Sequence, residues 1–370
     1  MGPALTLPRL VFGPGKLALL ADELAMLGVA RPLLVSDRGL EAAGVVARVM
    51  QAAPAITAQF LDVPENPTAA GVEQAAAAFR ENGCDSIIAL GGGSVLDTAK
   101  LLSAFVTTRL EKAADLITNP ALVTRDVTPL IAVPTTLGTG SESSPVTGMH
   151  LEPGQPALGT RSPFLVPRVA LCDPDLTRTL PPRLIAATGV DALSHCIEGF
   201  LANSIHPIID ALALDGIRGV VAGIADAMKP DGDDARCSLM AAAYAGGVAI
   251  HKGLGPAHAF ALAFGDQHVH HGTMVGVALP WTTRLVAQHN PAKAAKLRGA
   301  LGLADDADIG DALAALIASV GVPISLRAAG YQLNSRERVL DFVVASHFNR
   351  TSGYVPTRDE YGAILDAITG

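Results

Sequence analysis

The most constraining feature of the sequence is a glycine-rich turn between a β-rich run and a helical segment. GGGSVLDTAK (91–100) directly follows the strand-like run CDSIIAL (84–90) and opens a segment with helical spacing. RPLLVSD (31–37) and TPLIAVPTT (128–136) also have the composition of strands, and Ala-rich helical patterns lie between these runs. Strands that alternate with helices predict a parallel sheet covered on both faces, with ligands bound at the carboxyl ends of the strands.

The second half of the chain has a different character. After LCDPDLTRTLPP (171–182), Ala-, Leu- and Ile-rich segments carry helical periodicity and few stretches resemble strands. Pro181 and Pro182 mark a predicted boundary and helix start. We therefore expect an α/β domain with a parallel Rossmann-like sheet over 1–180 and an all-helical domain over 181–370.

Composition argues against several classes of protein. The 370 residues are 49% apolar and only 17% charged, which argues against a disordered chain. A net charge of −8 argues against binding to nucleic acid or an anionic membrane. The amino terminus lacks the pattern of a secretory signal, and the apolar run SLMAAAYAGGVAI has the composition of a buried helix. The four cysteines are scattered without a CxxC pair, which favours reduced thiols and a cytoplasmic protein.

Several features of the first half suggest a dinucleotide site. A helix that starts in a glycine-rich turn presents free N–H groups and a positive dipole end to an anion such as a diphosphate. Such a turn is a weak signal alone, and this one is neither GxGxxG nor a Walker motif. Asp37 could accept hydrogen bonds from an adenosine ribose, or simply cap the following helix. VPTTLGTGSESS (133–144) could line a cofactor or form a polar turn.

Four side chains in the second half have the character of ligands for one divalent metal. Asp191 and His195 lie four residues apart, so a helix would place both on one face. His258 and His271 each lie in a glycine-containing segment. Three nitrogens and one carboxylate suit Fe(II) or Zn(II) better than Mg(II) or Ca(II). A structural role for each residue is the alternative, because single histidines near glycines and Asp-x-x-x-His pairs often have no metal.

Taken together, these motifs resemble the iron-containing (group III) alcohol dehydrogenase family. The resemblance covers essentially the whole chain and is most specific where PTTLGTGSE is followed by DALSH. It implies a dehydroquinate synthase-like architecture, with NAD or NADP in the first half and the metal in the cleft between the domains. The segments KGLG and HHGT most resemble the 4-hydroxybutyrate dehydrogenase branch. We also expect a homodimer.

The resemblance assigns roles residue by residue. The implied cofactor contacts are Asp37, Asn66, Gly92, Gly93, Ser94, Asp97, Thr135, Thr136 and Ser144. The implied metal ligands are Asp191, His195, His258 and His271, and we take His258 and His271 as the catalytic residues. The implied reaction is reversible hydride transfer between NAD, or NADP, and a short primary alcohol or semialdehyde bound to Fe(II) or Zn(II).

Two positions depart from the family pattern. Leu262 stands where the family commonly has a histidine near the nicotinamide, and Ala157 stands where it commonly has a lysine. A nearby histidine could replace the missing imidazole, or serve only at the surface or beside the ligands; the candidates are His251, His268 and His270. Arg161 and Arg350 could pair with a substrate carboxylate or lie solvated at the surface.

Two other functions remain open at this point. A non-redox lyase of the dehydroquinate synthase type also uses NAD and a metal, but it relies on several cations around a phosphorylated substrate. Lys252 is the main candidate for such a cation in the second half. A catalytically idle binding protein of the same fold is suggested by Ala157 and Leu262 and opposed by the four intact ligands.

Overall fold

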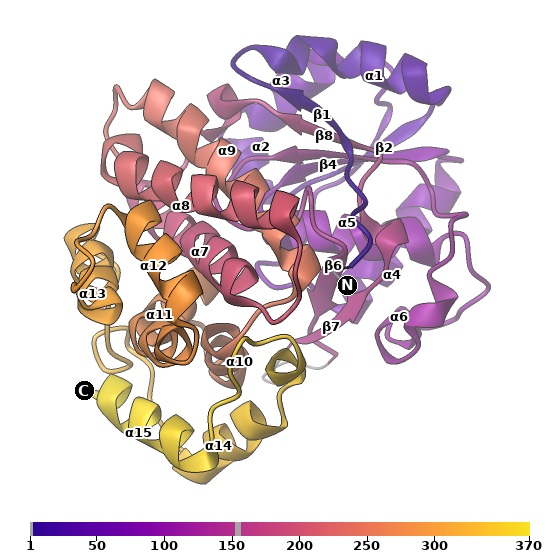
Figure 1. Cartoon of the computed structure of the whole chain (residues 1–370). Coiled ribbons are helices and arrows are strands. Elements are labelled where there is room, and N and C mark those ends of the chain that lie inside the picture. The colour runs from indigo at the N-terminus through magenta and orange to yellow at the C-terminus, as the bar shows by residue number, and fades with distance from the viewer. Residues whose placement is uncertain (1–2, 152–156) are drawn as a thin grey trace. The chain divides into compact units, whose positions relative to one another are not determined.

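The computed structural model describes residues 3–151 and 157–370, and the chain forms two compact units (Figure 1). The first unit is α/β and the second is helical, which confirms the predicted fold class. The first unit contains Thr6–Thr136 and Ser141–Leu180, and the second consists mainly of Pro181–Gly370 together with the short segment Leu137–Gly140.

The first unit is built on a six-stranded parallel sheet with the strand order β1-β8-β5-β4-β2-β3. The strands predicted over 31–37, 84–90 and 128–136 are present as β2, β4 and β5. The sheet strands are β1 (Arg9–Phe12), β2 (Pro32–Val35), β3 (Ala58–Phe60), β4 (Ser86–Gly91), β5 (Leu130–Pro134) and β8 (Val169–Cys172). A separate antiparallel pair is formed by β6 (Val146–Met149) and β7 (Leu158–Arg161).

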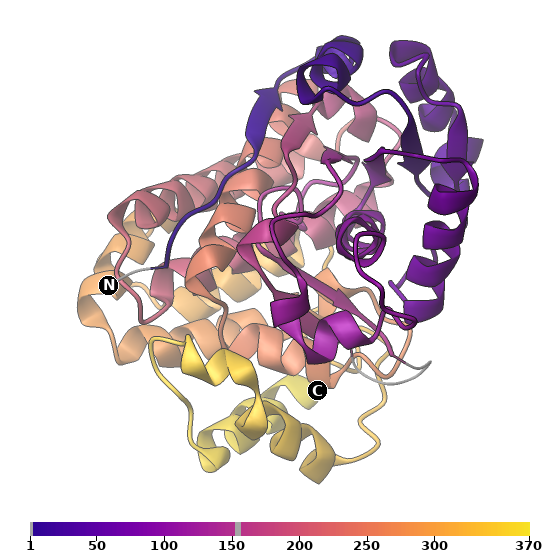
Figure 2. The ribbon, with the colours of Figure 1, turned by 90° about the vertical axis from the view of Figure 1, so that its right-hand side faces the viewer.

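Helices cover both faces of this sheet, as parallel strands require (Figure 2). Successive side chains of a strand point to opposite faces. Leu33 and Ile87 therefore pack with α4 (Ala69–Glu81) and α5 (Gly93–Phe105), whereas Leu34 and Ile88 pack on the other face with α1 (Leu20–Leu27) and α3 (Val45–Ala52). The short helices of this unit are α2 (Arg38–Ala42), α6 (Asp115–Thr118), η1 (Lys16–Leu19), η2 (Pro120–Leu122), η3 (Pro163–Leu165) and η4 (Pro174–Thr177).

All the secondary-structure elements described in the second unit are helices. Its elements are α7 (Pro182–Leu201), α8 (Pro207–Ala227), α9 (Asp233–Ala249), η5 (Ile250–Lys252), α10 (Pro256–Ala263), α11 (His271–Gln288), α12 (Pro291–Leu301), α13 (Ile309–Ser319), α14 (Arg336–Ala345), η6 (His347–Arg350) and α15 (Arg358–Thr369). As predicted, a helix begins at Pro182, where the missing N–H would have had no partner within the helix.

Helix α7 forms the centre of the helical unit. It is long and apolar enough to cross a membrane, but 94% of its most apolar window is buried inside the protein. It also carries Asp191, His195 and Glu198, all of which are buried. Polar residues of this kind on a buried helix indicate a core helix that presents a functional face.

Candidate functional site

Asp191, His195, His258 and His271 come together in the helical unit. Asp191 and His195 lie one turn apart on α7, His258 lies in the first turn of α10, and His271 begins α11. Asp191 Oδ1 lies 3.7 Å from His195 Nε2 and 3.8 Å from Nε2 of both His258 and His271. Ligand atoms of Asp191, His195 and His258 all lie within 4.8 Å of one another, and His271 lies outside this tightest set.

These distances fit one transition-metal ion. Two ligand atoms about 2.0–2.2 Å from one tetrahedral ion lie about 3.3–3.6 Å apart, and Asp191 Oδ1 lies only slightly farther than this, at 3.7–3.8 Å, from the three imidazole nitrogens. Asp191 Oδ1 and His258 Nε2 are buried and have no hydrogen-bond partner among the described residues. Buried polar atoms nearly always have a partner, so a cation between these atoms would complete the arrangement.

The environment also favours imidazole nitrogens that can bind a metal. Burial, together with the charge of His258, lowers the pKa of His195 to about 3. Burial and neighbouring imidazoles also lower the pKa of His271, although 44% of its side chain is exposed. Burial acts in the same direction on His258, but the Glu198 carboxylate outweighs it and raises the pKa. His195 and His271 are therefore neutral near pH 7, which is the form that donates a lone pair to a metal.

Glu198 is a residue of this site that was not predicted from the sequence. One of its carboxylate oxygens lies 2.5 Å from His258 Nδ1, and the other accepts a hydrogen bond from the backbone N–H of Ala257 at 2.7 Å. Its position seven residues after Asp191 on one helix places both on the same face. That spacing was visible in the sequence and could have identified it.

The glycines of the segment TLGTG have a packing role in the helical unit. A Cβ at Gly138 would lie 1.8 Å from the carbonyl oxygen of Thr188. Gly140 has a φ of +62°, and a Cβ there would lie 2.5 Å from the backbone of Gly247. Both positions therefore exclude a side chain, because backbone atoms of α7 and α9 occupy the space.

Several predicted cofactor residues lie at the carboxyl ends of neighbouring strands in the α/β unit. Helix α5 begins at Gly93, so its first N–H groups have no partner within the helix. A Cβ at Gly92 would lie 2.9 Å from Thr136 Cγ2, which places the glycine-rich turn beside the end of β5. Thr136 Oγ1 is buried without a partner among the described residues, and Thr135 is buried.

The remaining predicted contacts on this edge have partners within the protein. Ser94 Oγ donates to the carbonyl oxygen of Glu65, next to the exposed Asn66. Asp37 follows β2 and caps α2, since its Oδ1 accepts from the N–H of Leu40 at 2.9 Å. The cap anticipated as an alternative is therefore present, and the ribose contact stays a prediction.

Asp97 and Ser144 are held inside the α/β unit. Asp97 accepts hydrogen bonds from Ser141 Oγ at 2.6 Å and from the N–H of Gly148 at 3.1 Å. Ser144 Oγ lies 3.2 Å from Lys100 Nζ and is only 1% exposed. These bonds fasten the segment after β5 to α5, and a direct cofactor contact by either residue remains a prediction.

A buried charged cluster accompanies these bonds. Lys100 Nζ donates to the carbonyl oxygens of Ser144 and Val146 at 3.0 and 2.9 Å. Burial lowers the pKa of Lys100 to about 8, although Asp97 and Glu142 oppose the shift. Burial likewise raises the pKa of Glu142 to about 7, against the attraction of Lys100. The fold thus keeps two opposite charges where neither is well solvated.

This cluster predicts a pH-dependent stability. A carboxyl group whose pKa rises on folding from 4.5 to about 7 contributes stability that is full below pH 4.5 and lost as the pH rises through 7. Glu142→Gln should remove this dependence. We expect the unfolding free energy of the wild type, relative to E142Q, to fall by about 2–3 kcal/mol over that interval.

Denaturant unfolding at several pH values measures the effect. Glu81→Gln is the control, because Glu81 is exposed at the end of α4. If the unfolding free energies of the wild type and E142Q change in parallel with pH, burial does not raise the pKa of the Glu142 carboxyl.

Comparisons with known proteins agree with one another across the whole chain. A family model described as iron-containing alcohol dehydrogenase matches residues 8–174, and one described as the C-terminal part of the Fe-containing alcohol dehydrogenase family matches residues 185–369. A 4-hydroxybutyrate dehydrogenase of Cupriavidus necator is 38% identical over 366 residues, which cover 95% of this chain and 96% of the relative.

Solved structures have the same fold. A 1,3-propanediol oxidoreductase is 26% identical, with a TM-score of 0.91 and complete coverage of both chains. A sulfoacetaldehyde reductase of Bifidobacterium kashiwanohense, solved in complex with NAD+, is 24% identical with a TM-score of 0.93, and the match covers 100% of this chain and 99% of the other.

Proposed function

Because the chain belongs to the iron-containing alcohol dehydrogenase family and is thus an oxidoreductase, we propose that it oxidises 4-hydroxybutyrate reversibly to the corresponding semialdehyde, with NAD as hydride acceptor. The cluster of one carboxylate and three imidazoles around Asp191 Oδ1 is the observation that carries the chemistry. The 38% identity to a 4-hydroxybutyrate dehydrogenase supports the choice of substrate.

In this proposal Asp191, His195, His258 and His271 hold Fe(II) or Zn(II). When bound, the metal supplies a Lewis acid that makes an alcohol hydroxyl more acidic and a carbonyl more electrophilic. Asp191 contributes the negative charge that partly balances the cation. Three imidazoles contribute the other ligand atoms, and the three helices α7, α10 and α11 fix the positions of all four groups. His258 and His271 are catalytic residues in this sense.

The proposed cofactor contacts lie at the carboxyl ends of the strands of the sheet. The free N–H groups at the start of α5 would bind the diphosphate, with Gly92, Gly93 and Ser94 forming the turn. Thr136, whose buried hydroxyl lacks a partner in the described chain, lies beside this turn and would bind a polar group of the cofactor. Asp37 would accept hydrogen bonds from the adenosine ribose and would repel a 2′-phosphate, which favours NAD over NADP.

Asp37→Asn separates the two roles of this residue. Asparagine caps a helix about as well as aspartate, so α2 should keep its start. The charge that repels a 2′-phosphate is lost, and we expect the ratio of kcat/KM for NAD to that for NADP to fall about tenfold, an energy of about 1.4 kcal/mol. An unchanged ratio, measured by steady-state kinetics with both cofactors, would rule out Asp37 as the determinant.

Arg350 is the proposed partner of the substrate carboxylate. It ends η6, the same short helix in which Phe348 packs its ring 5.9 Å from the ring of His258. Arg350 is exposed, and its side chain makes no hydrogen bond or ion pair with another described residue. An exposed guanidinium two residues after Phe348, whose ring packs near the proposed ligand His258, suits a substrate with a carboxylate at one end.

Lys252, the main candidate cation for a lyase of the dehydroquinate synthase type, is occupied within the protein. Lys252 has a fully buried side chain that forms an ion pair with Asp210 and donates to the carbonyl oxygen of Phe200 at 3.3 Å. Its charge therefore serves the C-terminus of α7 and not a phosphorylated substrate. The homodimer and the cytoplasmic location stay predictions, and the free cysteines Cys84, Cys172, Cys196 and Cys237 are consistent with a reducing compartment.

An assay of NADH formation tests the proposed function. With metal present, 4-hydroxybutyrate should be oxidised with a kcat/KM at least about tenfold above that of 1-butanol, which lacks the carboxylate. Tight NAD binding without NADH formation from any short alcohol would instead support the idle binding protein. Equal rates for the two alcohols would leave the dehydrogenase reaction and remove the proposed substrate.

A further inference from the structure

Glu198 links two consecutive residues of the metal site's helix α10. Its Oε1 accepts from the N–H of Ala257 at 2.7 Å, and its Oε2 lies 2.5 Å from His258 Nδ1. Ala257 lies in the first turn of α10, whose N-cap Gly255 provides no side-chain cap. A Cβ at Gly255 would lie 2.9 Å from Glu198 Oε1, so glycine leaves room for the carboxylate. Glu198 therefore fixes both the start of α10 and the ring of His258.

This contact determines which nitrogen of His258 is free. A neutral imidazole carries its proton on one nitrogen and a lone pair on the other. A carboxylate beside Nδ1 favours the tautomer with the proton on Nδ1, which leaves a lone pair on Nε2. His258 Nε2 is the atom that lies 3.8 Å from Asp191 Oδ1 and is buried without a partner in the described chain. The geometry thus prepares this nitrogen for a cation.

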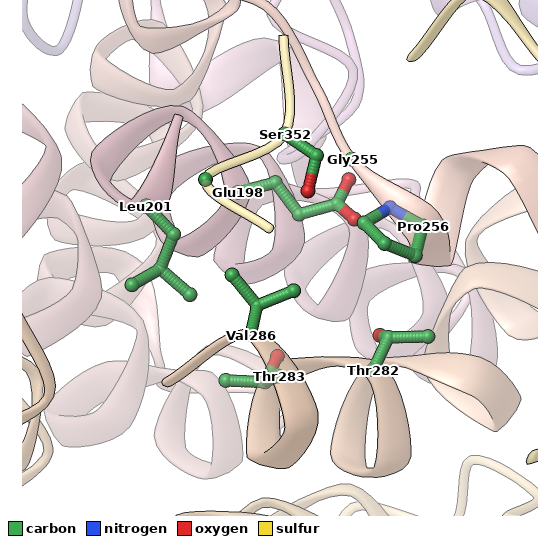
Figure 3. Close-up of a pocket in the computed structure, with 9 residues that line it drawn as sticks. Glu198, Leu201, Gly255, Pro256, Thr282, Thr283, Val286 and Ser352 are labelled. Atoms are coloured by element: carbon green, nitrogen blue, oxygen red, sulfur yellow. The ribbon is translucent and has the colours of Figure 1, made fainter. Parts of the chain in front are cut away.

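Glu198 also lines a small pocket. Figure 3 shows the Glu198 carboxylate between Ser352 and Pro256, with Thr282, Thr283 and Val286 presented from α11 across the pocket. The cavity volume is about 10 Å³, close to the minimum of about 10–15 Å³ that one water molecule needs. Thr283 Oγ1 is buried and has no partner among the described residues. Thr282 Oγ1, in contrast, donates to the carbonyl oxygen of Ala278 at 3.0 Å.

We infer that Glu198 is a positioning residue that sets the metal-binding tautomer of His258, and that a single water in this pocket joins Glu198 to Thr283. The water supplies a partner for the Thr283 hydroxyl and donates to the carboxylate, whose oxygens have further lone pairs. Buried carboxylates that orient metal-binding histidines typically change metal affinity 10–100-fold when they are replaced. The inference rests on the proposed metal site and is independent of the substrate.

Glu198→Gln tests the role of the carboxylate. If the glutamine oxygen keeps the bond to Ala257, its NH2 group faces His258 Nδ1 and favours the tautomer with a proton on Nε2. We expect the metal dissociation constant to rise about 10–100-fold, measured by competition between the metal-free protein and a chromophoric chelator for Zn(II). The melting temperature of metal-free E198Q should stay near that of the wild type, whereas a purely structural role would lower it without changing metal affinity.

The outcomes separate this inference from the metal site itself. A wild type that binds no Zn(II) would remove the site. If the wild type binds Zn(II) and the dissociation constant of E198Q is within about twofold of the wild-type value, only the role of Glu198 is contradicted. Should E198Q fail to fold, Glu198→Asp decides in its place, because the shorter side chain withdraws the carboxylate from His258.

Thr283→Val tests the water, with Thr282→Val as a matched control on the same helix. Both changes keep the β-branched shape, but only Thr283 offers the pocket an unpaired hydroxyl. We expect T283V to weaken Zn(II) binding about two- to fivefold and T282V to leave it unchanged. Equal affinities for the two variants would contradict the bridging water.

Discussion

Replacing Asp191 by asparagine is expected to lower kcat/KM about 10³-fold or more, a loss of about 4 kcal/mol. Asp191 Oδ1 lies 3.7–3.8 Å from Nε2 of each of His195, His258 and His271. One ion placed between these atoms could therefore contact all four. Asparagine keeps the size of the side chain but removes the charge that balances a divalent cation. Metal content and steady-state kinetics of the purified variant measure the effect.

Stability should change in the opposite direction when the metal is absent. Asp191 Oδ1 is buried and has no hydrogen-bond partner in the described chain, which destabilises the metal-free protein. Metal-free D191N should therefore be about 1–3 kcal/mol more stable than the metal-free wild type, and added Zn(II) should raise its melting temperature little. If Asp191 served mainly as a partner of protonated histidines, D191N would instead be the less stable protein.

Gly272→Ala is expected to separate two of the ligand-bearing helices. Gly272 is the second residue of α11, directly after His271, and a Cβ there would lie 2.3 Å from the carbonyl oxygen of Ala187 on α7. The same Cβ would lie 3.2 Å from Asp191 Cβ. Because the obstructing atoms belong to the backbone, the first turn of α11 must move and carry His271 away from Asp191.

The expected effect of G272A is a loss of both metal affinity and activity. A displacement of about 1 Å at a catalytic group can cost about 10²-fold, and we expect a loss of this size in kcat/KM. Overpacking should also lower the unfolding free energy by about 1–3 kcal/mol. Gly299→Ala is the matched control, because a Cβ at that position in α12 meets no atom within 4 Å. It should stabilise the protein by about 0.5–1 kcal/mol. Wild-type metal affinity in G272A would contradict the close packing of α11 on α7.

Much of the fold could be predicted from short-range patterns. β4 and the start of α5 were visible because a strand-like run, glycines and a helical pattern follow one another directly in the chain. The strands β1, β3 and β8, which have three or four residues each, were not predicted from the sequence. β1 also pairs with β8, which lies about 160 residues later in the sequence, so no local pattern joins them.

Some residues of the site could be identified from the sequence and others could not. Asp191 and His195 could be paired by helical spacing, and Glu198 could have been added by the same reasoning. The need for glycine at positions Gly138 and Gly272 could not be predicted from the sequence. At each position a side chain would collide with a backbone carbonyl of α7, which is distant along the chain. Asp37 shows the limit of a single motif, since its helix cap is visible in the structure and its ribose contact needs a bound cofactor to be observed.

The most direct test of a metal-dependent hydride transfer is stoichiometric reconstitution of the metal-free protein. Fe(II) or Zn(II) is added in steps under anaerobic conditions, and the rate of NADH formation from 4-hydroxybutyrate is recorded at each step. The rate should start near zero and rise linearly to a plateau at one metal ion per chain, and D191N should show no rise. Full activity of the metal-free wild type, or an equal rise in D191N, would contradict a catalytic metal at Asp191 and its three histidines.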